Sequence, residues 1–176
     1  MPIETTRVMP HTHFEDFEVG QEMEYGKTTM TAEEIIRFGK AFDPEPFHLG
    51  QEAARDTMFG ELIASGIHMA AILRRMQVDG FANLHSQGSP EWERLQFLAP
   101  TRPGDVIHVR SKVLQTRPSS SRPALGIVRM QHELVDQNGQ VKTRVHTTIF
   151  YKRRGDPAPP ATSHSPRRPE QAARPS

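Results

Sequence analysis

The stretch from Ile67 to Met76 constrains the fold more than any other part of the chain. Its residues place apolar side chains on nearly every side of the helix that their spacing predicts. A helix that is apolar around most of its circumference is typically buried inside other structure. Ser65 is a favourable N-cap for this helix, Gly66 falls in its first turn, and Asp79-Gly80 ends the apolar pattern.

The segments after this helix alternate apolar and polar residues, as antiparallel strands with one solvated face do. Asn138-Gly139 is a strong hairpin signal between the last two of them. Strands are predicted over residues 21–30, 93–99, 105–116, 126–136 and 141–151. We therefore expect an α+β fold in which an antiparallel β-sheet wraps around one long central helix.

The region before the central helix predicts shorter helices. Thr31, with an acidic residue three positions later, forms a capping box for a helix over 32–42. That helix is expected to end at Asp43-Pro44, because the residue before a proline disfavours the helical conformation. Pro46 is expected to keep the following segment extended, and a short helix is predicted near Gln51–Asp56.

The length and the composition of the two ends predict one domain. The chain has 176 residues, which fits one domain with a tail. We expect residues 1–14 to be loose, residues 15–152 to fold, and residues 153–176 to form a disordered, proline-rich tail. From Gly155 onward alanine supplies the only apolar side chains, which cannot bury enough surface to offset the entropy of ordering.

The composition also excludes several classes of function. A formal net charge of +1 argues against a dedicated nucleic-acid-binding protein, which would be clearly basic. The absence of cysteine excludes disulfides, thiolate metal sites and cysteine nucleophiles. No apolar run approaches the ~20 residues that cross a bilayer, and the N-terminus has no secretory apolar core. We expect a cytoplasmic protein with no membrane or nucleic-acid partner.

Two features carry possible chemistry. Asp43 and His48 lie five residues apart on a chain stiffened by prolines, so their side chains could hold one water between them. The imidazole of His48 could take a proton from that water near neutral pH. Gly66, at the start of the central helix, could offer its backbone N–H to a polarised carbonyl oxygen. Each pattern also has a purely structural explanation. The prolines around Asp43 and His48 are common in turns, and Gly66 could be present only to allow tight packing.

These features together resemble the MaoC-like dehydratase family, the (R)-specific enoyl-CoA hydratases of the hotdog fold. Asp43, Pro46 and His48 match the family's approximate Gly-Asp-x-Asn-Pro-x-His motif. The segment 59–67 aligns with the start of the family's central helix, and 97–105 resembles the strand and turn that follow. The likeness covers roughly residues 15–152, and its three motifs agree in order and spacing.

The resemblance implies a hydratase or dehydratase acting on an acyl-CoA. Asp43 and His48 would activate a water, and the Gly66 N–H would bind the thioester oxygen, while water adds to or leaves the α,β double bond. No metal or organic cofactor is implied, because coenzyme A arrives as part of the substrate. A homodimer or higher homo-oligomer, joined edge to edge by its sheets, is expected. The further residues expected to contact the substrate are Phe47, Glu45, Ser65 and Ile67.

Three residues depart from the family pattern. Phe42 stands where the hydratases usually carry glycine, Glu45 where they carry asparagine, and Arg74 where short-chain enzymes carry a small residue. Glu45 would favour the imidazolium form of His48. These departures leave open a branched or carboxylated acyl group, a thioesterase on the same fold, and an accessory protein that binds acyl-CoA without turning it over.

Overall fold

The computed structural model describes residues 3–4, 13–81 and 85–155. The elements form where the hydrophobic patterning predicts them, with ends that differ by one to three residues in most cases. They are the strands β1 (Glu22–Thr29), β2 (Glu91–Phe97), β3 (Val106–Pro118), β4 (Leu125–Val135) and β5 (Val141–Lys152), the helices α1 (Ala32–Phe42), α2 (Pro46–Leu49), α3 (Gln51–Ala54) and α4 (Gly66–Phe81), and a 3-10 turn at Phe14–Asp16.

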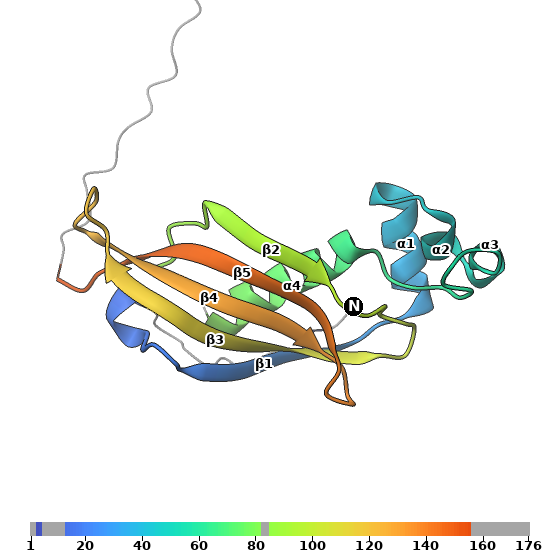
Figure 1. Ribbon diagram of the computed structural model, residues 1–176, viewed down its shortest axis with the longest axis horizontal. Coiled ribbons are helices and arrows are strands. Elements are labelled where there is room, and N and C mark those ends of the chain that lie inside the picture. The colour runs from blue at the N-terminus through green and yellow to red at the C-terminus, as the bar shows by residue number, and fades with distance from the viewer. Residues whose placement is uncertain (1–2, 5–12, 82–84, 156–176) are drawn as a thin grey trace, which may run out of the picture.

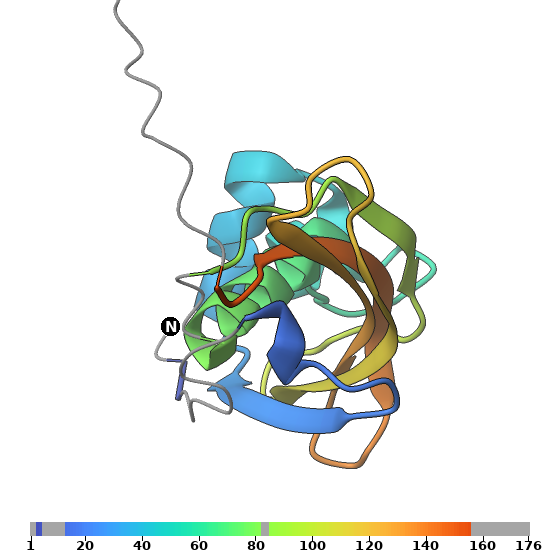
Figure 2. The same cartoon turned by 90° about the vertical axis from the view of Figure 1, so that its left-hand side faces the viewer.

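The five strands form one antiparallel sheet in the order β1-β3-β4-β5-β2. The sheet curves around α4, as the end-on view of Figure 2 shows, so the predicted hotdog fold is confirmed. Every second residue of the inner strands faces α4, and those residues form the core. The fully buried ones include Ile107, Val109, Val113, Val128, Met130, Leu134 and Val145.

The central helix is less enclosed than its sequence predicts. Ile67 is 56% exposed and Val78 is 40% exposed, although both are apolar. The sheet covers the side of α4 that carries Met69, Leu73 and Met76, and a strip on the opposite side stays open. The expectation of a helix buried all round was therefore wrong for this strip.

The helices α1 to α3 gather beyond the end of the sheet, close to the N-terminus of α4 (Figure 1). The predicted N-cap is present, because Thr31 Oγ1 accepts a hydrogen bond from the backbone N–H of Glu34 at 3.3 Å. The prediction of an extended segment after Pro46 was wrong: Pro46 begins α2. Proline is well suited to the first turn of a helix, where its missing N–H would have no partner.

The ends of the described region meet each other. Arg154 pairs with Asp16 at 2.5 Å and Arg153 with Glu15 at 3.4 Å, so the folded part continues past Lys152. The remaining predictions for 1–14 and 153–176 fall mostly outside the described residues. Within the described part of the chain, no helix is long and apolar enough to span a membrane.

The packing of β1 on α4 depends on Gly26, which gives the first testable prediction. Gly26 has a φ of 66° at a register shift in β1, and a Cβ there would lie 2.9 Å from Cγ of the buried Met76. Gly26→Ala should lower the free energy of unfolding by about 2–5 kcal/mol, through left-handed strain and overpacking together. Urea unfolding measures the loss.

Gly139→Ala is the matched control. Gly139 has a φ of 81° but open space around the position of a Cβ. Its substitution should cost only the strain, about 1–2 kcal/mol. Equal losses for the two variants would show that contact with Met76 contributes nothing.

Candidate active site

Asp43, His48 and Ser65 come together although they belong to three different elements. Asp43 is the C-cap of α1, His48 lies in α2, and Ser65 directly precedes α4. The Asp43 Oδ2 atom lies 3.5 Å from His48 Nε2 and accepts a hydrogen bond from Ser65 Oγ at 2.5 Å. The two residues that the sequence proposes as catalytic are therefore neighbours at the N-terminal end of the central helix.

The main chain sets the orientation of His48. Its Nδ1 lies 2.8 Å from the carbonyl oxygen of Ile63, which can only accept, so Nδ1 carries the proton. In the neutral ring, Nε2 then presents its lone pair towards the Asp43 carboxylate. Both atoms are acceptors, and a water between them could donate one hydrogen to each. The imidazole is 5% exposed, so few waters compete for this place.

Ser65 connects the site to the start of α4. Its Oγ donates to Asp43 and accepts a hydrogen bond from the backbone N–H of Ile67 at 3.1 Å. The first N–H groups of a helix have no partner within the helix, and Ser65 satisfies that of Ile67. Among the described residues, none accepts a hydrogen bond from the N–H of Gly66. That N–H lies at the positive end of the helix dipole.

A pocket of about 380 Å³ lies beside this group and is mainly apolar. His48 and Gly66 both line it, so the imidazole and the helix start open into the same space. The side chain of Phe97 covers Gly66, because a Cβ on Gly66 would lie 2.6 Å from that ring. The other lining residues are Phe47, Phe59, Ile63, Ala64, Met69, Leu98, Ala99, Pro100, Thr101 and Thr143.

Several residues singled out in the sequence do not line the pocket, and Asp43 and Ser65 are among them although they lie beside His48 and Gly66. Glu45 is the exposed N-cap residue of α2, and Phe42, at the end of α1, is 74% exposed. Ile67 directs its side chain to solvent, and its backbone N–H bonds to Ser65. The expected substrate contacts of Glu45, Ser65 and Ile67 therefore have no support in the lining of this pocket, whereas Phe47 does line it.

Thr101 is a pocket residue that sequence reasoning missed. It is 2% exposed, and its Oγ1 has no hydrogen-bond partner among the described residues. Its backbone oxygen accepts a hydrogen bond from Ala64, which connects the pocket wall to the segment before α4. Thr101 falls inside the family-like segment 97–105, but a threonine in a turn carries no signal of its own.

A buried lysine holds that wall in place. Lys142 is 2% exposed, and its Nζ lies 3.1 Å from carboxylate oxygens of both Asp105 and Asp136. Nζ also donates to the carbonyl oxygen of Pro100 at 3.1 Å, and the backbone oxygen of Lys142 accepts from Leu98 at 2.8 Å. Burial alone would raise the pKa of Asp136, but hydrogen bonds from the Gln140 backbone and from Lys142 outweigh it and lower that pKa.

Two other buried histidines are part of the core. His132 Nδ1 bonds to Ser111 at 2.7 Å, and its Nε2 bonds to Thr147 at 3.0 Å. Burial, with the nearby charge of Arg74, lowers its pKa to about 3. His68 stacks on Phe38 with ring centroids 4.4 Å apart, and burial lowers its pKa as well.

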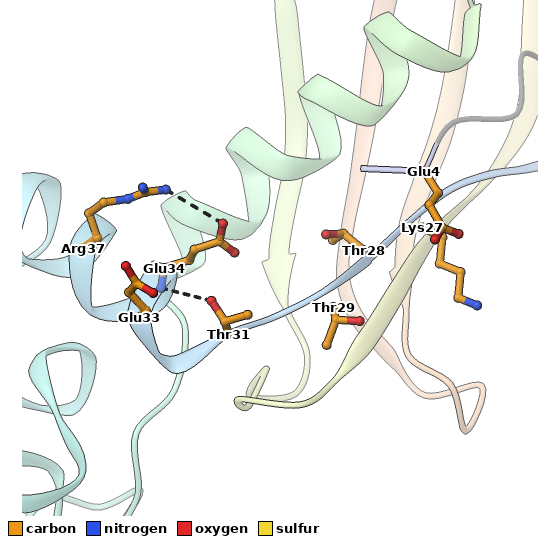
Figure 3. A pocket seen from close by; sticks show the side chains of 8 residues that line it. All are labelled: Glu4, Lys27, Thr28, Thr29, Thr31, Glu33, Glu34 and Arg37. Atoms are coloured by element: carbon orange, nitrogen blue, oxygen red, sulfur yellow. Dashed lines mark hydrogen bonds and ion pairs between the residues drawn. The ribbon is translucent and has the colours of Figure 1, made fainter. Parts of the chain in front are cut away.

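A second hollow, of about 490 Å³, lies between β1 and the start of α1 (Figure 3). Its lining mixes acids, bases and threonines, and the acids and bases partly neutralise one another: Arg37 lies 3.9 Å from Glu34. Figure 3 shows these side chains spread around the hollow without converging on one point. The pocket beside His48 is the better candidate for chemistry, because His48 and the start of α4 both line it and the Asp43 carboxylate lies 3.5 Å from His48 Nε2.

Comparison with known proteins identifies the family. The model of the family described as "MaoC like domain" matches residues 16–136. The chain belongs to this MaoC-like family. The match includes Asp43, His48, Ser65 and Gly66 in one continuous segment.

Individual MaoC-like proteins are similar over most of the chain. A crystal structure of the MaoC-like dehydratase from Rhodospirillum rubrum is 40% identical, covers 82% of this chain and 99% of its own, and superimposes with a TM-score of 0.75. The 3-hydroxybutyryl-CoA dehydratase of Methylorubrum extorquens is 27% identical over 76% of this chain and 83% of its own length. The uncharacterized protein YdeM of Bacillus subtilis is 30% identical over 65% of this chain and 80% of its own.

The buried Lys142 gives a second prediction. Lys142→Met leaves two carboxylates without their shared cation and should lower the free energy of unfolding by about 3–5 kcal/mol at neutral pH. The pKa of Asp136 is lower in the folded protein than its ordinary value of 3.8. The stabilisation that the ion pair with Lys142 contributes is therefore present above pH 3.8, and it is lost as the pH falls through the folded-state pKa of Asp136. The difference between the two proteins should therefore shrink below about pH 4.

Urea unfolding at several pH values measures this difference. Lys152→Met, a half-buried lysine on the same strand, is the control and should change stability by no more than about 0.5 kcal/mol. A difference between Lys142→Met and the unsubstituted protein that stays constant down to pH 2 would contradict the ion-pair explanation.

Proposed function

We propose that this MaoC-like protein is a hydro-lyase that adds water to, or removes it from, the α,β double bond of an acyl-CoA thioester. The observation that carries the proposal is the contact of Asp43 with His48 Nε2 at 3.5 Å, beside the start of α4. A family member similar over most of the chain is a 3-hydroxybutyryl-CoA dehydratase, which catalyses this class of reaction.

In the hydration direction, Asp43 and His48 hold a water above the β carbon of the substrate. His48 Nε2 takes one proton from this water while its oxygen bonds to the β carbon. The electron pair of the double bond moves towards the thioester carbonyl, and the N–H of Gly66 stabilises the enolate oxygen. The α carbon then receives the proton, so no net proton is gained or lost. The reaction needs neither a metal nor an organic cofactor.

The roles of the neighbouring residues follow from their contacts. Ser65 is a positioning residue, because it donates to the Asp43 carboxylate and does not line the pocket. Ile63 acts through its carbonyl oxygen, which fixes the tautomer of His48. Phe47 and Phe59, whose ring centroids lie 4.9 Å apart, give the pocket an apolar wall suited to an acyl chain.

The third prediction tests the reaction and its site. Trans-2-enoyl-CoA and 3-hydroxyacyl-CoA thioesters are supplied, and loss of the conjugated double bond and release of free thiol are followed together. We expect interconversion without thiol release. Asp43→Asn and His48→Gln should each lower kcat/KM by about 10²–10⁴-fold. Glu45→Gln, an exposed carboxylate between them in sequence, is the control and should leave the rate unchanged.

The same assay separates the other functions. Release of free thiol would identify a thioesterase instead. Binding of the thioesters without turnover would identify an accessory acyl-CoA-binding protein. Turnover that survives both substitutions would show that the reaction takes place elsewhere.

We propose in addition that two copies of the chain associate through β2. This strand pairs only with β5 among the described strands, so its other edge is available. Phe97 is 52% exposed on it, and the adjacent Leu98 is 47% exposed. Both residues also line the pocket, so a second copy on this edge would cover the pocket wall.

The fourth prediction concerns this association. Sedimentation of the unmodified protein should give the mass of a dimer or a higher oligomer, and Leu98→Asp should shift it towards the monomer, because a carboxylate is costly to bury in an interface. Met58→Asp, which changes a residue that is 91% exposed, should not alter the mass. A monomeric unmodified protein would disprove the proposed association.

A further inference from the structure

Arg74 lies about two turns beyond Gly66 on α4. Gly66, Ala70 and Arg74 follow one another at intervals of four residues, which places them on one face of the helix. Arg74 is half-buried, and it makes no hydrogen bond or ion pair with any other described residue. The next residue, Arg75, points to solvent and pairs with Asp79 at 2.6 Å. A partly buried cation that has no anion among the described residues is unusual, because burial removes its water without supplying a new partner.

Gln77 is a second unsatisfied donor on this side of the helix. It is 2% exposed, and its Nε2 is buried with no hydrogen-bond partner among the described residues. Successive residues of an α-helix are rotated by about 100° about its axis. Viewed down that axis, Gln77 therefore points in a direction between those of Gly66 and Ala70. Buried donors of this kind are normally paired, so an isolated one indicates a missing acceptor.

The sheet opposite this part of α4 is polar as well. Tyr25, Ser111, His132 and Thr147 form one hydrogen-bonded row across its inner face, with distances of 2.9, 2.7 and 3.0 Å. The positive charge of Arg74 contributes, after burial, to lowering the pKa of His132. The charge of the Arg74 guanidinium therefore interacts electrostatically with a buried residue of the core.

The face of α4 that carries Gly66, Ala70 and Arg74 begins at the pocket. Gly66 and Met69 line the pocket, and Ala70 has a small side chain beside them. Arg74 lies about 12 Å further along the helix axis than Gly66, and its side chain, like other long ones on a helix, leans back towards the N-terminus. The remaining distance suits an acyl chain of about four to six carbons whose thioester oxygen is held at Gly66.

We propose that Arg74 and Gln77 bind a carboxylate at the far end of the acyl chain, so that the substrate is a short enoyl-CoA with a free terminal carboxylate. This inference rests on the proposed function. A guanidinium and an amide N–H are both donors, and a carboxylate is an acceptor with two oxygens and the opposite charge. It would satisfy both groups at once, whereas a methyl end would leave both unpaired.

The test compares thioesters of equal length that differ only at the far end. Glutaconyl-CoA ends in a carboxylate, and trans-2-pentenoyl-CoA ends in a methyl group. The unsubstituted protein should hydrate glutaconyl-CoA with the higher kcat/KM. Arg74→Met should lower that value by about 30-fold or more, because one partner of a desolvated charge pair is lost. The value for pentenoyl-CoA should stay the same or rise, which also shows that the variant folds.

Arg75→Met is the matched control and should change neither substrate, because Arg75 lies on the open side of the helix. Gln77→Leu should lower kcat/KM for glutaconyl-CoA only. A preference for pentenoyl-CoA in the unsubstituted protein, or an equal loss for both substrates in Arg74→Met, would overturn the carboxylate subsite.

Binding of saturated analogues distinguishes this failure from failure of the proposed function. Glutaryl-CoA should bind more tightly than pentanoyl-CoA, and Arg74→Met should remove the difference. If the two analogues bind in this way but no thioester is hydrated, the proposed hydro-lyase activity is refuted and the carboxylate subsite is supported. Hydration of neutral thioesters, with equal binding of the two analogues, would keep the hydro-lyase and refute the subsite.

Discussion

The hydrogen bond from Ser65 to Asp43 is the contact on which the candidate site depends. It joins the C-terminal end of α1 to the N-terminal end of α4, two elements that otherwise share few contacts. The carboxylate that it holds lies beside His48, and the same hydroxyl accepts the N–H of Ile67. One side chain thus satisfies the helix start, orients the acid and leaves the N–H of Gly66 available for a ligand. A core of purely apolar contacts could not specify these directions, because apolar packing is not directional.

The pocket wall depends on a similar arrangement. The turn that carries Pro100 and Thr101 contains no large apolar side chain to bury, so packing alone would hold it weakly. Lys142 holds this turn in place instead, because its ammonium group pairs with the carboxylates of Asp105 and Asp136 and donates a hydrogen bond to the carbonyl oxygen of Pro100. Such a group is costly to bury and is stable only when every donor is used. The buried polar groups around the pocket thus set the directions of its side chains, while the apolar residues of the sheet and of α4 provide the general stability.

Periodicity was enough to predict most of the fold. Alternation along 126–136 and 141–151 gave the inner faces of β4 and β5 correctly, since a period of two residues assigns each side chain to one face. The apolar run at Ile67–Met76 predicted α4, but composition could not reveal which strip the sheet leaves open. Pro46 was misjudged because proline is equally suited to an extended segment and to the first turn of a helix.

Spacing along the chain predicted one contact of the candidate site, that of Asp43 with His48. Asp43 and His48 are close because few residues separate them, and their proximity could be anticipated from spacing. The carbonyl of Ile63 and the hydroxyl of Thr101 reach the site through tertiary folding, and neither residue type draws attention in a sequence. Glu45 shows the reverse case, because proximity in sequence to His48 did not place its side chain in the pocket.

The position of β2 has a consequence for how this protein can diversify. The strand is paired on one side only, and its register shifts between Glu93 and Gln96, with Arg94 in a left-handed conformation at a φ of 51°. Its last residue, Phe97, covers Gly66, while the four other strands make the rest of the sheet without it. Substitution of Phe97 can therefore change the space beside Gly66 without altering the pairing of the four other strands.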